Sequence, residues 1–419
     1  MIAAAALLRD GHGPVDVRIV ERGDTVGPGL AYRTSEPMHL LNNYAGRMSA
    51  LEDDPGDLVR WCLGQGLTVS PETFLPRHVY GGYLAGLLGR VDAHPGSRVT
   101  RLRGEVVSLE EGGAGYVAGL ASGGRMVADV VVLALGNPPP RDLPAYRDLG
   151  TPYAPDPWAS GLVDRVGPGS RVLLVGSGLT AVDVAAELAA AHHDVEMVAV
   201  SRQAMLPRRH RSAAPHADDP FPVGPGRLAG VLAEVRRRGA RLEEDGADWR
   251  TLVESVKAVA NDLWAGMPPR ERDRFVRHVA RHWEVARHRM APQVADVVEG
   301  LLLDGRLRVA TPDEVDPTGF DLVVNCTGPA PAWTPGWNPL VDALAARGLL
   351  RPDPLRLGLD VTPDGRLVGC DGRAARGIHV LGAARRGVEW EVAAVPDLRR
   401  QAAALAAHVA APVPELVGG

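Results

Sequence analysis

Short apolar runs alternate with longer stretches of helical spacing along most of the chain. Residues 172–175 form one apolar run, and residues 195–200 form a second. Between them, residues 179–192 carry apolar side chains at the spacing of an amphipathic helix. A Gly-Ser-Gly sequence at residues 176–178 separates the first run from this helix. The order predicts a parallel βαβ unit with a glycine turn.

This turn has the composition of a dinucleotide-binding loop. Its glycines let the backbone approach a pyrophosphate, and the N–H groups at the helix start are free to bind phosphate. Ala181, in the third glycine position, still permits close packing of helix on strand. The candidate cofactor-binding residues of this unit are Gly176, Ser177, Gly178, Leu179, Thr180, Ser201 and Arg202.

The end of the second strand distinguishes between two nicotinamide cofactors. NAD-binding units carry an acid there for the ribose 2′-hydroxyl, whereas this chain carries Ser201 and Arg202. A hydroxyl and a guanidinium suit a 2′-phosphate, so we predict NADPH rather than NADH. The alternative interpretation is a parallel α/β unit that binds no nucleotide.

A second unit of this kind is predicted near Met1. Residues 15–21 alternate between apolar and polar side chains and end in Glu21, an acid placed to hold a ribose. A helix-forming run at residues 1–9 and a turn at residues 10–14 precede them. The order of helix, turn, strand and acid matches a βαβ unit without its first strand and glycine turn. The alternative is a surface helix followed by an ordinary strand.

Three further buried strands end in a small residue and a glycine. They cover residues 129–136, 321–328 and 377–382, and they place Gly136, Gly328 and Gly382 at their ends. The last of them is followed by a helix from about Glu391, whose first N–H groups can point at an electron-rich ring.

Together these features resemble the bacterial FAD-NAD(P)-binding protein family, whose members have two dinucleotide-binding domains. The family is related to flavin monooxygenases, and some members are similar to FAD-dependent urate hydroxylases. The resemblance covers nearly the whole chain. Besides the turn at 176–181, it rests on residues 27–32, 39–42, 47–50, 76–84, 201–202, 206–208, 390–391 and 394–396. It implies FAD and NADPH as cofactors, and it adds Arg47, Trp390 and Glu391 to the candidate cofactor-binding residues. For Trp390 and Glu391 the alternative is a core tryptophan and a helix cap.

The chain departs from the family at its start. The first strand and the G-x-G-x-x-G loop that hold the FAD pyrophosphate in the family are absent before Met1. A start assigned too late is the simplest explanation, and we expect the sequence as given to bind FAD poorly. That strand lies in the middle of the sheet, so its absence should leave two neighbours with unpaired backbone groups.

The predicted fold class is α/β, with two Rossmann-like dinucleotide-binding domains. Residues 1–145 and 335–419 form a discontinuous FAD domain, and residues 150–330 form the NADPH domain with a helical insertion at about 226–303. Within the first domain we expect helices at 53–64 and 78–91. We also expect two antiparallel strands, at 98–109 and 116–127, around a Gly-Gly turn.

Composition narrows the class of protein. The 419 residues carry 46 basic and 51 acidic side chains, a net charge of −5, which favours neither nucleic acid nor an anionic membrane as a partner. No apolar run is long enough to span a membrane, and residues 1–8 lack the basic region of a signal peptide. We therefore expect a cytoplasmic enzyme, with its oligomeric state left open. Lys257 is the only lysine.

The cofactors would carry out the redox chemistry, so no catalytic triad is expected. The three cysteines, Cys62, Cys326 and Cys370, are far apart in the sequence and form no C-x-x-C pair for disulfide reduction. We therefore predict an FAD- and NADPH-dependent oxidoreductase that hydroxylates a small organic substrate in the manner of a monooxygenase. The alternatives are an NADPH oxidase or reductase without oxygen insertion, and a flavin-free NADPH-binding regulatory protein.

Two basic segments add candidates. In residues 277–289, helical spacing predicts one face with His278, His282 and Arg289 and another with Trp283 and Arg287. This segment is either a pocket for substrate or NADPH, of a kind that suits an anionic or heteroaromatic ligand, or a solvated helix. No H-E-x-x-H sequence or cysteine partner supports a metal there.

The other basic segment follows Arg202. One of Arg208, Arg209 and Arg211 is expected to assist with phosphate. The linker at residues 153–158 lacks the histidine that related monooxygenases often have, and we interpret it as a proline hinge with a packed tryptophan.

Overall fold

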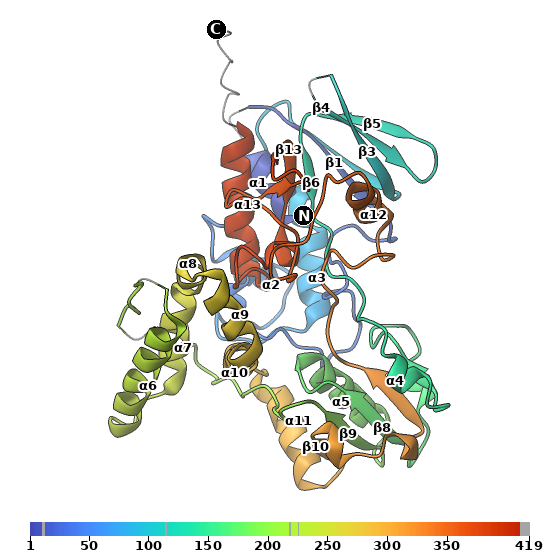
Figure 1. Cartoon of the computed structure of the whole chain (residues 1–419), viewed down its shortest axis with the longest axis vertical. Helices are drawn as coiled ribbons and strands as arrows, with labels where there is room; N and C mark the ends of the chain where they lie inside the picture. The colour runs from blue at the N-terminus through green and yellow to red at the C-terminus, as the bar shows by residue number, and fades with distance from the viewer. Residues whose placement is uncertain (11–12, 114, 218, 225, 411–419) are drawn as a thin grey trace.

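The computed structural model describes residues 1–10, 13–113, 115–217, 219–224 and 226–410. Two α/β domains lie at opposite ends of the long axis, and a group of helices projects from their junction (Figure 1). The turn predicted at residues 10–14 includes residues 11 and 12, which lie outside the described residues.

The NADPH domain predicted from the sequence is built on a five-stranded sheet with the order β10-β9-β8-β11-β7. All four pairings are parallel. The strands are β7 (Tyr153–Ala154), β8 (Arg171–Val175), β9 (Glu196–Val200), β10 (Leu307–Ala310) and β11 (Leu322–Asn325). The predicted strand–helix–strand order is therefore correct, with α5 (Leu179–Ala191) between β8 and β9.

The core of this domain lies between the sheet and two helices. Val172 and Leu174 of β8 are buried against Val184 and Leu188 of α5. The helix α11 (Pro292–Leu303) packs beside α5 and adds Val298 to the same core. Each buried aliphatic side chain stabilises the folded domain by about 1.5–3 kcal/mol. The glycine turn between β8 and α5 is therefore held by a well-packed core.

The other domain, called the first domain below, contains three small sheets. The domain with the five-stranded sheet is called the second domain. The first pairs β1 (Asp16–Glu21) with β2 (Arg98–Arg103) in parallel. In the second, β13 (Ala374–Val380) pairs in parallel with β6 (Val131–Leu133) and antiparallel with β12 (Arg366–Val368). Among the described residues β1 bonds only to β2, and β6 bonds only to β13. The parallel pairings of this domain are therefore divided between two sheets.

The third sheet corrects one prediction. It is antiparallel, with the order β3-β4-β5, and comprises β3 (Val106–Gly112), β4 (Gly115–Leu120) and β5 (Arg125–Ala128). The single strand predicted at 98–109 is two strands, because the chain turns after β2, where the Gly104 amide donates to the Glu21 carbonyl. Only β3 pairs antiparallel with β4, whereas β2 continues the parallel pairing of β1.

Helices cover the sheets of the first domain. α1 and α13 pack side by side (Figure 1). A cluster that contains Leu58, Tyr80 and Tyr83 forms the core beneath α2 and α3. The helices of this domain are α1 (Ile2–Asp10), α2 (Asp57–Gly64), α3 (Arg77–Ala85), α12 (Pro339–Ala346) and α13 (Val395–Ala410). A short helix, α4 (Pro144–Arg147), lies in the linker to the second domain.

The predicted helical insertion is present, and it is called the helical arm below. Its helices are α6 (Leu228–Glu244), α7 (Trp249–Ala258), α8 (Ala260–Gly266), α9 (Pro269–His278) and α10 (Ala280–Arg287). Phe221, Leu242, Leu252 and Leu263 give it a small core of its own. Within this helical arm, α9 and α10 lie nearer to the junction of the two domains than α6 and α7 do (Figure 1). Within the described part of the chain, no helix is both long enough and apolar enough to cross a membrane.

Candidate functional site: a glycine turn and the junction of the domains

The two glycines of the turn have different structural roles. Gly176 has φ of 122°, and a Cβ placed on it would lie 2.3 Å from the Cys326 carbonyl oxygen, so the approach of β11 requires glycine there. Gly178 precedes α5 with extended backbone, and its nearest neighbour would be Arg281 Nη1, 4.0 Å from a placed Cβ. The space over Gly178 is therefore open to a ligand.

The first turn of α5 has donors to offer. Within the described part of the chain, no side chain caps the helix at Gly178, so the amides of Leu179 and Thr180 have no side-chain capping partner there. These N–H groups and the helix dipole make an anion site of the kind that binds a pyrophosphate.

The serines predicted to contact the cofactor hold the turn in place. The buried Ser177 hydroxyl donates to the Met205 carbonyl at 2.7 Å, and the Ser201 hydroxyl lies 2.7 Å from the Ser177 hydroxyl. The two serines thus tie the end of β9 to the glycine turn. Their contact with a cofactor remains a prediction.

Arg281 is the site residue that the sequence analysis did not assign. It comes from α10, and its Nη2 donates to the Ser177 carbonyl at 3.1 Å and to the Ser177 hydroxyl at 3.0 Å. Its other terminal nitrogen lies over Gly178. Burial lowers the pKa of Arg281 from its ordinary value, but a guanidinium stays charged at neutral pH. A fixed cation therefore stands beside the open glycine.

The other arginines near the turn differ in what they already bind. The side chains of Arg202 and Arg208 are exposed, and neither makes an ion pair or hydrogen bond within the described residues. Arg209 pairs with Asp296 and Glu299, and Arg211 pairs with Asp248. Of the three arginines considered to assist Arg202, Arg208 is the one available for a phosphate.

Glu21 and three glycines lie at strand ends, as predicted. Glu21 ends β1, and its carboxylate accepts from the Gly23 amide at 2.9 Å. Gly136, Gly328 and Gly382 follow β6, β11 and β13, with φ of 72°, 81° and 77°. Gly328 belongs to the sheet of the second domain, while the other two belong to the first. Placed Cβ atoms on Gly136 and Gly328 meet nothing within 4 Å, so both backbones are accessible.

Trp390 is enclosed by packing. Its ring is 7% exposed and lies 5.1 Å from the Trp264 ring and 4.8 Å from the Phe275 ring, centroid to centroid. The Arg386 guanidinium lies 4.3 Å from its centroid. These contacts fit the core-tryptophan interpretation, and contact with a cofactor remains a prediction.

Glu391 joins the arm to the first domain. Its buried carboxylate accepts from Trp283 Nε1 at 2.8 Å and from Arg287 Nε at 3.1 Å, so these two residues share a helix face as predicted. The Asn261 side chain also bonds both the amide and the carbonyl of Glu391. Arg47 makes a second connection, with its Nη1 2.8 Å from Glu254 Oε2.

The predicted face of His278, His282 and Arg289 is wrong. α9 ends at His278, and Val279 has φ of −116° and ψ of −34°, which breaks the helix before α10 begins. Arg289 lies beyond the end of α10 and pairs with Glu254. The described residues hold no group of His, Cys, Asp or Glu side chains that fits a metal ion.

The linker at residues 153–158 is packed between the domains. The Trp158 ring meets the His39 ring edge to face at 5.7 Å, and the Arg77 guanidinium lies 5.9 Å from its centroid. The packed tryptophan is therefore observed, and a hinge role for the linker stays a prediction.

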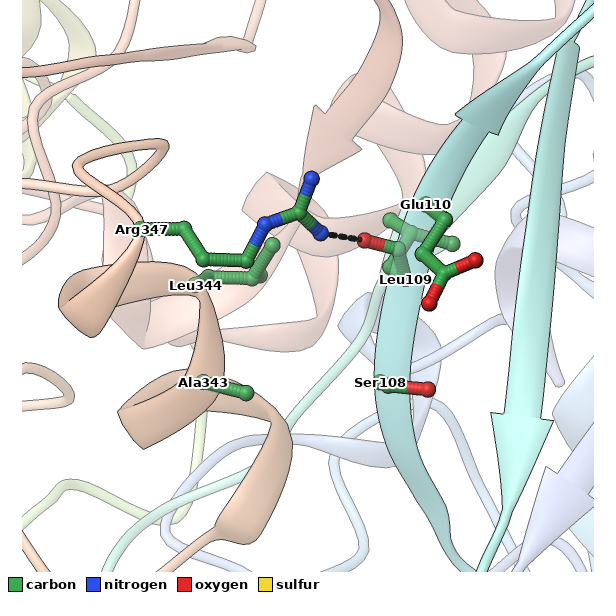
Figure 2. Close-up of a pocket in the computed structure, with 6 residues that line it drawn as sticks. All are labelled: Ser108, Leu109, Glu110, Ala343, Leu344 and Arg347. Carbon is green, nitrogen blue, oxygen red and sulfur yellow. Dashed lines mark hydrogen bonds between the residues drawn. The ribbon is translucent and has the colours of Figure 1, made fainter. Parts of the chain in front are cut away.

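A shallow pocket of about 330 Å³ lies elsewhere, between β3 and α12. Figure 2 shows the Arg347 guanidinium extending across it to donate to the Leu109 carbonyl. Because its arginine is already bound and the glycine turn belongs to the other domain, this pocket is separate from the candidate cofactor site.

All three cysteines are free thiols. Cys62 and Cys326 are buried in the cores of different domains, and Cys370 is exposed. Burial raises the pKa of the Cys326 thiol well above its ordinary value. None of them can form a redox-active pair.

Comparisons with known proteins agree with this architecture. Residues 1–138 match the family model described as FAD-NAD(P)-binding. A search of curated protein sequences found no match. Ornithine hydroxylase PvdA of Pseudomonas aeruginosa is 14% identical, with a TM-score of 0.56 over 94% of this chain and 91% of that chain.

Two further solved structures have TM-scores of 0.58. Ornithine N-hydroxylase KtzI of Kutzneria sp. 744, described with reduced FAD, NADP⁺ and L-ornithine, is 13% identical over 97% of this chain and 95% of that chain. The cadaverine monooxygenase DfoA of Erwinia amylovora, described with FAD, is 12% identical over 100% of this chain and 94% of that chain. The chain therefore has the fold of the flavin monooxygenases with two dinucleotide-binding domains, and its first 138 residues match the FAD-NAD(P)-binding family model.

Proposed function

We propose that the protein is an FAD- and NADPH-dependent oxidoreductase that hydroxylates a small organic substrate in the manner of a monooxygenase. The observation that carries the proposal is the open backbone at Gly178, with the first amides of α5 and Arg281 beside it. A glycine turn with free amides and a fixed cation is built to hold a pyrophosphate.

NADPH fits this site better than NADH. The side chain of Arg202 is exposed and without a partner among the described residues, at the end of the strand where the adenosine ribose lies in such units. Arg208 is free in the same way. Two uncommitted guanidiniums offer bidentate donors to a 2′-phosphate.

The residues of the first domain fit FAD in part. Glu21 stands at the end of β1 for a ribose, and Gly136 has accessible backbone beside the divided sheet. Bound flavin would supply electron transfer from NADPH and the reaction with oxygen. The protein's own part is to hold the nucleotides, position the substrate and exclude water at the junction of the domains.

The electron acceptor follows from the cysteines. Reduction of a disulfide by a paired thiol needs two adjacent cysteines, and Cys62, Cys326 and Cys370 are separate and free. We therefore infer that electrons pass to oxygen and an organic substrate. The three free thiols and the net charge of −5 also support a cytoplasmic protein that binds no nucleic acid.

Three measurements on the purified protein test the proposal in sequence. After incubation with excess FAD, the visible absorption spectrum should show bound flavin, and NADPH should bleach it faster than NADH. With a substrate present, oxygen labelled with ¹⁸O should enter the organic product. Flavin reduction without label in any product would indicate an oxidase or reductase instead. Nucleotide binding without flavin, even after FAD is added, would indicate a flavin-free NADPH-binding protein.

A further inference from the structure

Three cations lie together where the helical arm meets the first domain. Lys257 is in the last turn of α7, Arg287 is the last residue of α10, and Arg289 follows it. Lys257 interacts electrostatically with Arg287, and Arg287 with Arg289. We call these three residues the junction cations.

The junction cations have donors to spare. Arg287 is 7% exposed, and its Nη2 has no hydrogen-bond partner among the residues that the structure describes. Arg289 is 1% exposed, and neither its Nε nor its Nη1 finds a partner among them. Lys257 makes no hydrogen bond or ion pair with any described residue. Burial and the charge of Arg287 lower its pKa to about 8. Buried donors without acceptors are costly, so a missing acceptor is indicated.

The neighbouring carboxylates do not meet this demand. Glu254 is shared by Arg47 and Arg289, and Glu391 is shared by Trp283 and Arg287. Both accept through two oxygens and still leave the donors described above without partners.

The remaining acid and the nearby histidine add little. Asp397 Oδ1 accepts from Arg400, and its buried Oδ2 has no hydrogen-bond partner among the described residues, so Asp397 accepts nothing from the junction cations. His210, which faces Arg287 and Arg289 from the loop after β9, has its pKa lowered by burial to about 3 and is neutral. Arg47 and Arg400 already pair with Glu254 and Asp397, so the local excess is positive even with every neighbouring acid charged.

We propose that the junction cations bind an oxyanion, and that this oxyanion is the carboxylate of a small organic acid that serves as the substrate. The identification of this carboxylate as the substrate's rests on the proposed function. The anion site itself rests only on the unpartnered donors. Arg287 and Arg289 offer planar forks that match a carboxylate, and Lys257 adds a point charge. The site lies at the junction of the arm and the first domain. Arg281, which bonds Ser177 of the glycine turn, lies on the same helix as Arg287.

The single lysine gives a direct test. Arginine supplies every other basic residue of the chain, so an amine reagent modifies only Lys257 and the chain's terminal amine. The purified protein, with its flavin content recorded, is treated with methyl acetimidate, and the peptide that holds Lys257 is followed by mass spectrometry. The reaction is run with benzoate, with its neutral analogue benzamide, and with inorganic phosphate.

Benzoate should slow the modification of Lys257 at least fivefold at saturation, and benzamide should leave it unchanged. Equal protection by phosphate and benzoate would support the oxyanion site but overturn its restriction to carboxylates. Equal rates with benzoate and benzamide would overturn the site itself. None of these modification rates depends on enzyme turnover. The anion-site proposal can therefore be overturned while NADPH still reduces the flavin, and the proposed function can be overturned while benzoate still protects Lys257.

Variants separate binding from folding. Lys257→Met keeps the length of the side chain without its charge and should weaken benzoate binding, measured by calorimetry, about tenfold. Lys257→Arg should keep most of it. Arg236→Met is the matched control, because Arg236 is exposed on α6 and makes no ion pair among the described residues. Unchanged affinity in folded Lys257→Met, or the same loss in Arg236→Met, would contradict the assignment.

Discussion

Arg77 Nη2 donates to Asp183 Oδ2 at 2.6 Å and so joins the two domains. Arg77 begins α3 of the first domain and Asp183 lies in α5, just after the glycine turn. Their side chains are 14% and 6% exposed. Burial raises the pKa of Asp183 although Arg77 opposes the change. The pair therefore holds α5 against the first domain, and the burial of its two charges carries a high desolvation cost.

Breaking this pair should destabilise the protein strongly. Asp183→Asn leaves the Arg77 charge buried without a counter-charge, which costs about 3–5 kcal/mol in such pairs. Chemical denaturation measures the loss. The exposed pair of Arg125 and Glu110 is the control, since Glu110→Gln should change stability little. Equal effects of both variants would show that the domain contact does not depend on this bond.

Arg202→Ala should remove most of the preference for NADPH over NADH. A charge-assisted bond to the 2′-phosphate contributes about 1.5–3 kcal/mol, or roughly 10- to 150-fold in affinity. The ratio of the two dissociation constants is the measurement. Arg209→Ala is the control, because Arg209 is already paired with Asp296 and Glu299. An unchanged ratio in Arg202→Ala would remove this residue from the site.

Arg281→Met should weaken NADPH and NADH by the same factor. Arg281 lies over Gly178, where the pyrophosphate common to both cofactors is expected. A loss of about tenfold for each follows from one charge-assisted bond. A loss confined to NADPH would instead place Arg281 at the 2′-phosphate.

Gly178→Val should abolish nucleotide binding and leave the melting temperature nearly unchanged. A Cβ at Gly178 enters open space, with its nearest neighbour 4.0 Å away, but its methyls occupy the path of the pyrophosphate. Gly176→Ala is the contrasting variant. Its Cβ would meet the Cys326 carbonyl at 2.3 Å, so it should lower the melting temperature. Normal flavin reduction by NADPH in Gly178→Val would place the nucleotide elsewhere.

His210 should make the protein less stable in mild acid. Burial and the charge of Arg289 lower its pKa from 6.5 to about 3 in the folded protein. Below pH 6.5 the unfolded chain takes up a proton that the folded protein does not, so stability falls as the pH falls. Between pH 7 and pH 5 the loss is about 2 kcal/mol.

The measurement compares wild type with His210→Gln, which keeps a donor toward the Asn42 carbonyl. Unfolding free energies are determined at pH 7 and pH 5. The wild type should lose more than the variant, because the variant lacks the titrating ring. Parallel losses would assign the acid sensitivity to other groups.

The βαβ unit around Gly178 was predictable because its signals are local: two apolar runs, two glycines and a helical period within 30 residues. The boundaries of β8, α5 and β9 differ from the prediction by a residue or so. Glu21 and the glycine-ended strands were found for the same reason.

Arg281 could not be found in this way. It reaches Ser177 across 104 positions, and nothing in an arginine-rich segment distinguishes it from its neighbours. The error at His278 and Arg289 has a different cause. Helical spacing continued through Val279, but the backbone there leaves helical geometry, and periodicity alone does not show such a break.

α10 carries Arg281 near one end and Arg287 at the other. At 1.5 Å per residue, about 9 Å of rigid helix separates a contact with the nucleotide turn from a contact with Glu391. A nucleotide that draws Arg281 toward its phosphates would therefore move the helix that also holds Arg287. Any effect of occupancy at one end on affinity at the other must be reciprocal. The helix makes this enzyme a candidate for ordered binding, in which the nucleotide sets how tightly the second ligand is held.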